Sequence, residues 1–294
     1  MLSILIPTYN YDCTRLVRDL QMLAERAGIV YEIIVADDAS PMRMCTEKNR
    51  EINALPHCRL VELVENVGRA RIRNRLADEA RYEWLLFMDC DAEVVSDEFI
   101  VNYLAHTDAE VVCGGLCHAD TLPSPEVSLR YVYEKRADRK RAARYRAKNP
   151  YGQFISFCFM IRSDVFHAVR FDERITEYGH EDTLFGIGLE QRKADIRHID
   201  NPMRQGGIET NEEFLEKTCA ALRNLATMED AMQGYSALLR VVRLLRRVGA
   251  HRLLACGFVR YESRITRRLC SRKPSLGLFF IYKLGYYCSL LRAT

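Results

Sequence analysis

The chain has 294 residues, 48% of them hydrophobic and 28% charged, which is the composition of an ordinary globular protein. This length accommodates one large α/β unit or a catalytic domain with an appendage. The eleven cysteines include no Cys-x-x-Cys pair, which argues against a zinc site, and Ser3 and Pro7 interrupt the first apolar stretch, which argues against a secretory leader. We therefore expect reduced thiols and a cytosolic protein.

Strands and helices alternate in the predicted order of elements. Apolar, β-rich runs predict strands at 2–10, 31–40, 58–65, 83–95 and 110–115. Helical spacing predicts helices at 14–28, 46–55 and 67–82, and helices from 211 to the C-terminus. The alternation is typical of a doubly wound, mostly parallel α/β sheet, here with a helical C-terminal extension.

Polar residues follow three of these strands: Thr8, Tyr9 and Asn10 after the first, Asp37 and Asp38 after the second, and Asp89 and Asp91 after the fourth. Ligands of open α/β sheets bind at the carboxyl ends of the strands. We therefore predict a binding site at this edge.

Asp89 and Asp91 flank Cys90 at the end of a buried strand. On an extended chain both side chains point the same way, so they can share a hard cation such as Mg²⁺ or Mn²⁺ that also holds a diphosphate. The alternative is that the two aspartates only cap the following turn.

Two further groups have both a functional and a structural interpretation. Asp37 and Asp38 either contact a base and ribose or form a turn that caps the next helix. Arg69 and Arg71, after Gly68, either hold phosphate at the start of a helix or lie on its solvated face.

The segment 178–189 places His180, Glu181 and Asp182 after a glycine and before an apolar helical run. An acid at a helix start is an ordinary partner of the helix dipole. Two consecutive acids with a histidine favour a general base supported by a neighbour.

Taken together, these stretches resemble family 2 of the glycosyltransferases, of the bacterial surface-polysaccharide type with the GT-A fold. The matching stretches are SILIPTYN, EIIVADDAS, ENVGRARIRNRLADEARYEWLLFMDCDAE, FDERITEYGHEDTLFGIGL and IRHIDNP, which span residues 2 to about 209. The resemblance implies a GT-A catalytic domain over 1–209, with a nucleotide-sugar half (1–112) and an acceptor half (113–209), followed by a basic helical region over 210–294.

The resemblance also implies roles for individual residues. Nucleotide-sugar donor binding falls to Pro7, Thr8, Tyr9, Asp37, Asp38, Arg71 and Asp89. Mn²⁺ or Mg²⁺ binds at Asp91 with Asp89. Asp182 matches the catalytic base, with Glu181 beside it, and Glu181 and His180 lie at the acceptor site. Many relatives carry a metal-binding histidine where this chain has Gln205, which is equally a weak ligand or a structural residue.

The predicted reaction transfers a sugar from a nucleotide-sugar donor, with a UDP-sugar favoured, to a hydroxyl of a glycan or a lipid-linked acceptor. The transfer inverts the configuration of the sugar. Two alternatives remain open. A nucleotidyltransferase also combines a sheet, a metal and a nucleotide, but residues 6–14 lack the usual glycine and lysine of its phosphate loop. A nucleotide-binding or assembly module with a decayed site is the second alternative.

The formal net charge of +3 is unevenly placed, because residues 236–294 hold thirteen Lys/Arg and a single acid, Glu262. At 100° per residue the segment 237–254 places Arg240, Arg243 and Arg247 in a narrow arc, with Leu238, Val241, Val242, Leu244, Leu245 and Val248 opposite. The basic helix either packs on the catalytic domain or makes a peripheral contact with anionic lipid on the inner face of the membrane. No nucleic-acid-binding module accompanies it.

Overall fold

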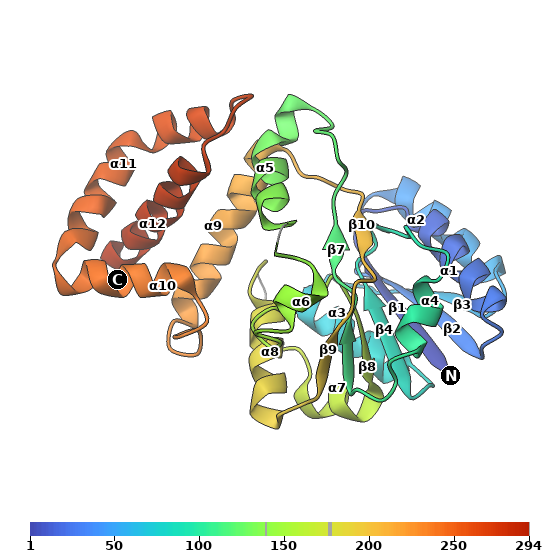
Figure 1. Cartoon of the computed structure of the whole chain (residues 1–294). Coiled ribbons are helices and arrows are strands. Elements are labelled where there is room, and N and C mark those ends of the chain that lie inside the picture. Colours follow the sequence, from blue (N-terminus) through green and yellow to red (C-terminus); the bar gives the residue numbers. More distant parts are fainter. Residues whose placement is uncertain (139, 176–177, 294) are drawn as a thin grey trace. The chain divides into compact units, whose positions relative to one another are not determined.

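Figure 1 shows the computed structural model of the chain, which describes residues 1–138, 140–175 and 178–293. Thr294, the last residue of the predicted C-terminal region, lies outside this description. The described residues form two compact units. The first comprises 1–118, 140–175 and 181–207, and the second comprises 119–138, 178–180 and 208–293.

A seven-stranded sheet organises the first unit (Figure 1). Its strands, in spatial order, are β3 (Cys58–Glu62), β2 (Tyr31–Asp37), β1 (Leu2–Thr8), β4 (Trp84–Met88), β8 (Cys158–Arg162), β6 (Val111–Cys113) and β9 (Ile196–His198). All neighbouring pairs are parallel except those of β8, which runs antiparallel to both β4 and β6. The predicted α/β class with a mostly parallel sheet is confirmed.

The central strands are apolar on both faces because helices cover both. Alternate residues of β1 enter different cores: Leu2, Ile4 and Ile6 pack on one face and Leu5 on the other. The first face is covered by α1 (Thr14–Arg26) and α4 (Phe99–Leu104), and the second by α3 (Arg69–Glu79), α7 (Ser163–Val169) and α8 (Glu181–Arg192). Shorter elements at the rim are α2 (Arg43–Asn49), η1 (Arg50–Ala54) and α6 (Ala143–Arg146).

One prediction about β4 is wrong. The strand was expected to continue through residues 89–95, but it ends at Met88, and Ala92 N–H donates to the Asp89 carbonyl at 3.1 Å. Residues 89–92 therefore form a turn, because this four-residue hydrogen bond reverses the chain. The chain then enters a separate three-stranded sheet of β5 (Ala92–Glu93), β10 (Met203–Gln205) and β7 (Leu116–Cys117).

The second unit is helical, with a short η2 (Pro125–Val127), α5 (Ser128–Asp138), α9 (Asn211–Thr227), α10 (Ala237–Arg247), α11 (Ala250–Leu269) and α12 (Leu276–Ala293). A capping box of Thr210 and Glu213 starts α9. The hydrophobic core of the second unit contains Leu129, Phe214, Phe258 and Phe279, which come from four of these helices. None of the described helices is both long enough and apolar enough to cross a bilayer.

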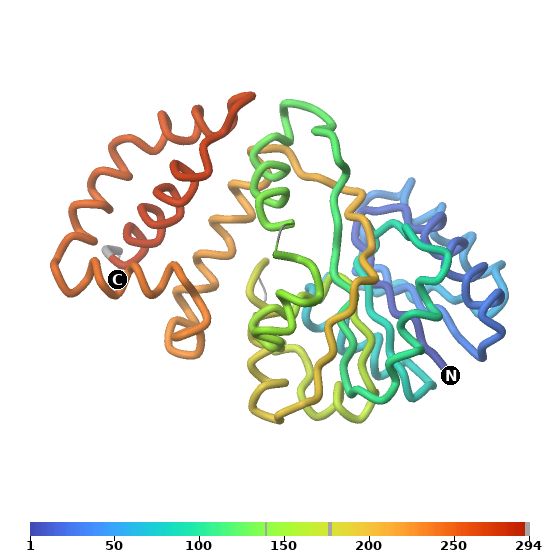
Figure 2. The backbone as a smooth tube through the Cα atoms, viewed as in Figure 1, coloured from blue at the N-terminus to red at the C-terminus, as the bar shows by residue number. Residues whose placement is uncertain are grey.

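The path of the chain turns sharply between α10 and α11, as the tube in Figure 2 shows. Gly249 makes this turn with a φ of +72°, a left-handed conformation that glycine adopts without a steric penalty. Leu244 and Val248 were predicted on the apolar side of this helix, yet they are 60% and 75% exposed. The buried side consists of Leu238, Leu239 and Val242, because the helix meets its neighbours only there.

Candidate active site

The carboxyl ends of β1, β2 and β4 bring most of the predicted residues to one edge. Thr8 pairs with Asp37 in the register of β1 and β2, and Asp38 N–H donates to the Thr8 carbonyl at 2.9 Å. The adjacent strand β4 delivers Asp89 to the same edge, since β1 and β4 are parallel neighbours. The expectation that three separate strands converge here is confirmed by the sheet order.

The loops after β1 and β2 are tied together by Asn10. Its N–H donates to the Ser40 hydroxyl at 2.7 Å, and its side-chain oxygen accepts from the Met42 N–H at 3.0 Å. Asn10 has a φ of +52°, a left-handed conformation that asparagine tolerates better than most residues. Next to it Tyr9 is 49% exposed, so an aromatic face is open at this edge for a planar ligand to stack on.

Asp37 and Asp38 are both buried and both hold loop backbone. Asp37 accepts from Ser40 N–H at 2.9 Å and from the Thr46 hydroxyl at 3.3 Å. The two oxygens of Asp38 accept from the N–H groups of Val67 and Gly68, at 2.7 and 2.9 Å. Asp38 therefore fixes the residue that precedes α3, and the structural interpretation of this pair describes the contacts that we observe.

Two arginines from α3 hold the Asp89 carboxylate. Arg73, almost fully buried, donates from Nη2 to Oδ1, and Arg69 donates from Nη2 to Oδ2 at 3.1 Å. Arg69 also donates from Nε to the Glu181 carboxylate at 2.8 Å. One guanidinium thus joins the turn after β4 to the first turn of α8, so the positive charge beside Asp89 comes from the protein itself.

Arg71 occupies a different side of α3. Its Nε donates to Glu173 at 3.1 Å, and neither Asp89 nor Glu181 receives a hydrogen bond from it. Residues two apart on a helix do not share a face, whereas residues four apart do, which separates Arg71 from Arg69 and Arg73.

Asp91 faces the small sheet instead. Gln205 Nε2 donates to its Oδ2 at 3.4 Å, and Gly206 N–H donates to its backbone carbonyl at 2.7 Å. A Cβ added at Gly207 would lie 3.3 Å from Asp91 Oδ2, so glycine permits this close approach. Burial raises the pKa of Tyr11, and the negative charge of the nearby Asp91 raises it further, so a phenol lies near the same carboxylate.

The donor set around Asp91 fits a hard cation. Mg²⁺ and Mn²⁺ favour oxygen ligands, and Mg²⁺ usually takes one or two carboxylates together with substrate phosphates and water. Asp91 offers a carboxylate and Gln205 a carboxamide. Within the described residues no group of three or more His, Cys, Asp or Glu side chains could hold a metal. A diphosphate would therefore have to complete the coordination.

Glu181 and Asp182 begin α8 in different environments. Glu181 is buried against Arg69. Burial and the neighbouring Glu181 charge raise the pKa of Asp182 to about 6, although Thr183 N–H donates to Oδ1 at 2.7 Å and Arg69 is nearby. A carboxylate with such a pKa is ionised at neutral pH yet basic enough to accept a proton. His180, just before the helix, has a φ of +72°.

Sequence analysis missed Arg73 and Tyr11, and it placed Asn10 at this edge without the contacts that tie the two loops together. Arg73 reads as a solvated residue of a charged helix, yet it lies four residues after Arg69, and this spacing was the available signal that both face one side. The contacts of Asn10 and Tyr11 depend on loops that meet only in the folded chain.

The order of the sheet and the carboxylates at its edge are typical of a GT-A glycosyltransferase fold. Two solved structures of glycosyltransferases have a similar fold. This chain belongs to the family described as glycosyl transferase family 2, whose model matches residues 3–170. Membership of this family decides against the nucleotidyltransferase alternative.

The chain is similar to several known proteins. An uncharacterized glycosyltransferase of Haemophilus influenzae is 31% identical over 91 residues, which are 31% of this chain and 29% of that protein. The mannosyltransferase PcManGT from Pyrobaculum calidifontis, solved with GDP-Man and Mn²⁺, has a TM-score of 0.56 at 14% identity over 97% of this chain and 85% of the other. Residues 1–349 of S. aureus TarS have a TM-score of 0.51 at 14% identity, over 100% of this chain and 92% of the TarS chain. This chain covers 39% of a longer TarS chain.

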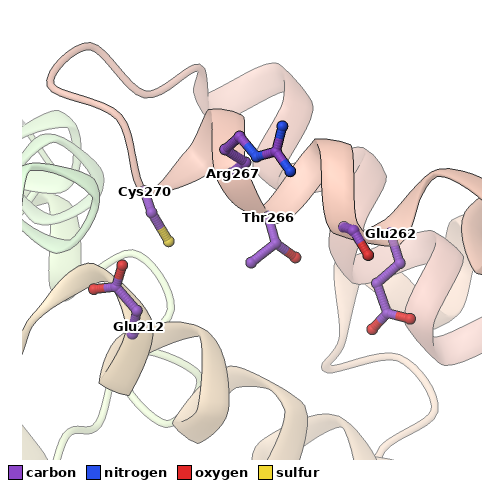
Figure 3. A pocket seen from close by; sticks show the side chains of 6 residues that line it. Glu212, Glu262, Thr266, Arg267 and Cys270 are labelled. Carbon is purple, nitrogen blue, oxygen red and sulfur yellow. The ribbon is translucent and has the colours of Figure 1, made fainter.

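A pocket of about 570 Å³ lies within the helical unit (Figure 3). Glu212 of α9 lies across it from Glu262, Thr266 and Arg267 of α11. Burial and Glu212 raise the pKa of Cys270 to about 11, so this thiol is protonated at neutral pH. The pocket contains none of the residues predicted for catalysis.

Proposed function

We propose that the chain transfers a sugar from a nucleotide-sugar donor, with a UDP-sugar favoured, to a hydroxyl of a glycan or lipid-linked acceptor. The transfer inverts the configuration at the anomeric carbon. The observation that carries the proposal is the chain of contacts Asp89–Arg69–Glu181. It brings the aspartate turn after β4 next to the helix start that bears Asp182, which supports placing the proposed donor site and the proposed proton acceptor close together.

Asp182 is the proposed base. Its carboxylate takes the proton of the acceptor hydroxyl while the oxygen bonds to the anomeric carbon, and the bond from that carbon to the diphosphate breaks with the electron pair leaving on the diphosphate. A single displacement from the opposite face inverts the configuration. Holding both substrates in line supplies much of the acceleration, and a general base typically adds about 10²- to 10⁴-fold.

The proposed donor site consists of Pro7, Thr8, Tyr9, Asp37, Asp38, Arg71 and Asp89. The exposed ring of Tyr9 is suited to stack on the base. Asp38 accepts a hydrogen bond from the Gly68 N–H and thereby positions the start of α3. Asp89 orients Arg69 and Arg73, and its own oxygens remain able to accept from a ribose hydroxyl.

Asp91, with the Gln205 carboxamide, is the proposed ligand set for Mn²⁺ or Mg²⁺. When bound, the cation supplies positive charge that stabilises the departing diphosphate. PcManGT, which is similar in fold, was solved with GDP-Man and Mn²⁺, so GDP-sugars belong in the donor panel.

Glu181 and His180 are the proposed acceptor-side residues, with Glu181 also held by Arg69. The test does not require the acceptor to be known, because water can replace the acceptor hydroxyl in slow donor hydrolysis. We expect NMR of freshly released sugar, read before mutarotation, to reveal the inverted anomer with one of the UDP-, GDP- or dTDP-sugars. Release of the retained anomer would contradict the single-displacement proposal.

A further inference from the structure

Arginines and aliphatic residues alternate on the surface at the corner between α10 and α11. Six residues define what we call the corner face: Arg240, Leu244, Arg247, Val248, Arg252 and Leu253. All six are exposed, and Leu244, Val248 and Leu253 expose 60%, 75% and 77% of their surface. Aliphatic side chains exposed to this degree and grouped together mark an interaction surface more often than scattered single ones do.

Helix geometry places the first four of the six residues together, and the other two follow directly after the turn at Gly249. Arg240, Leu244 and Arg247 follow at spacings of four and three on α10, which is one face of a helix, and Val248 lies one turn after Leu244. The chain turns between α10 and α11 (Figure 2). Gly249 in this turn has a left-handed conformation, and Arg252 and Leu253 lie in the first turn of α11. The buried residues of α10, Leu238, Leu239 and Val242, lie on the opposite side.

The arginines of α10 do not all behave alike. Arg246 points away from the corner face and donates to both oxygens of Glu229, at 2.6 and 3.1 Å, where Tyr287 also donates at 2.9 Å. Arg243 donates to Gln233 at 2.7 Å. These contacts anchor α10 within its unit. Arg240, Arg247 and Arg252 instead give a dense positive charge to a surface where Glu262 is the one acid from residue 236 onward.

We propose that the corner face docks onto the surface of an anionic lipid bilayer, with the arginines at the headgroups and Leu244, Val248 and Leu253 inserted between them. The amphipathic arrangement is that of helices that lie in the interface, where apolar burial and attraction to anionic lipid add together. None of the described helices is able to span a bilayer, so the contact is peripheral.

Two other occupants fit the face less well. A second copy of the chain meeting it through a two-fold axis would bring the same arginines against each other, and like charges repel. Single-stranded nucleic acid is held by positive grooves with aromatic side chains on which bases stack, whereas the corner face offers aliphatic ones. An anionic leaflet accepts both the charge and the aliphatic side chains.

The first test is sedimentation of the full chain with phosphatidylcholine vesicles that contain or lack phosphatidylglycerol. We expect binding only with phosphatidylglycerol. Because each arginine near an anionic surface contributes about five-fold in affinity, Arg240→Gln, Arg247→Gln and Arg252→Gln together should weaken binding roughly 100-fold. The matched control, Arg15→Gln, Arg75→Gln and Arg81→Gln, removes the same charge from exposed positions of the first unit and should leave binding within about two-fold.

The second test separates insertion from charge alone. Leu244→Ser, Val248→Ser and Leu253→Ser together keep every charge, and we expect at least ~10-fold weaker binding that becomes more sensitive to salt. Sedimentation that is equal with and without phosphatidylglycerol, or unchanged in both triple variants, would overturn the proposal. Absence of vesicle binding with a dimer that the same variants dissociate would assign the face to a second copy.

Discussion

Arg69 donates from Nε to Glu181 at 2.8 Å and from Nη2 to Asp89 at 3.1 Å, so one guanidinium serves both the proposed donor side and the proposed acceptor side. Glu181 raises the pKa of Asp182, and Arg69 lowers it. Arg69 is therefore a positioning residue that limits how strongly Asp182 holds a proton, and this role can be measured.

Arg69→Gln should move the acid limb of the pH profile of kcat/KM to higher pH. Without the guanidinium, the influence that lowers the pKa of Asp182 is lost while the Glu181 charge still raises it, so Asp182 takes up a proton more readily. The profile of donor hydrolysis is sufficient for the measurement. Arg75→Gln, on the exposed side of the same helix, is the control. An acid limb that stays in place in Arg69→Gln would mean that Arg69 only braces the fold.

Asp182→Asn should lower kcat by about 10²- to 10⁴-fold, because the amide cannot accept the proton of the attacking hydroxyl. Nucleotide affinity, measured by calorimetry, should change little, since the proposed place of Asp182 is on the acceptor side. A variant with normal turnover and weakened nucleotide binding would place Asp182 in the donor site instead.

The same substitution should stabilise the fold at neutral pH. The pKa of Asp182 is about 6 in the folded chain, above its ordinary value of about 3.9, so the folded state holds more protons between these values and its stability falls as pH rises. Above about pH 6 the full cost persists, and Asp182→Asn removes it. We expect a higher Tm at pH 7.5 and no gain near pH 4, by scanning calorimetry. Asp97→Asn, at an exposed position, serves as the control, and a gain independent of pH would refute the explanation.

The two aspartates of the turn should respond differently to alanine. Asp89→Ala leaves the buried guanidinium of Arg73 without its carboxylate, and breaking a buried ion pair costs on the order of 3 kcal/mol of unfolding free energy. Asp91 is half-buried and accepts a hydrogen bond of 3.4 Å from the neutral amide of Gln205, so we expect Asp91→Ala to cost less than Asp89→Ala. Urea unfolding measures both, and equal losses would contradict the division of roles.

Much of the fold follows from sequence pattern, and the reasons are visible in particular strands. In β1, β2 and β4 the consecutive apolar residues 4–6, 33–36 and 84–88 indicate burial on both faces, which requires helices on both. The antiparallel direction of β8 has no local signal, because a buried run reads alike in either direction. The short strands β5, β7 and β10 each have two or three residues, too few for a pattern.

The site was predictable as a set of residue types but not as a set of contacts. Asp89 and Asp91 were expected on an extended chain, and a turn instead directs one to α3 and the other to β10. Local sequence cannot reveal this, because the partners Arg73 and Gln205 lie 16 residues before Asp89 and 114 residues after Asp91. Leu244 is exposed although it was predicted on the apolar side of its helix. The sequence pattern of a helix indicates an apolar face but not which part of that face packs against a neighbour.

The central claim is a nucleotide-sugar site at the edge of the sheet with a cation held at Asp91, and calorimetric titration tests it most directly. UDP, GDP and dTDP are titrated into the purified chain with Mn²⁺ or Mg²⁺ and again with a chelator, for the natural sequence and for Asp91→Ala. We predict that one nucleotide binds with metal, that chelator weakens this binding, and that Asp91→Ala abolishes the dependence on metal. Failure of all three nucleotides to bind, or binding that neither chelator nor Asp91→Ala changes, would contradict the account.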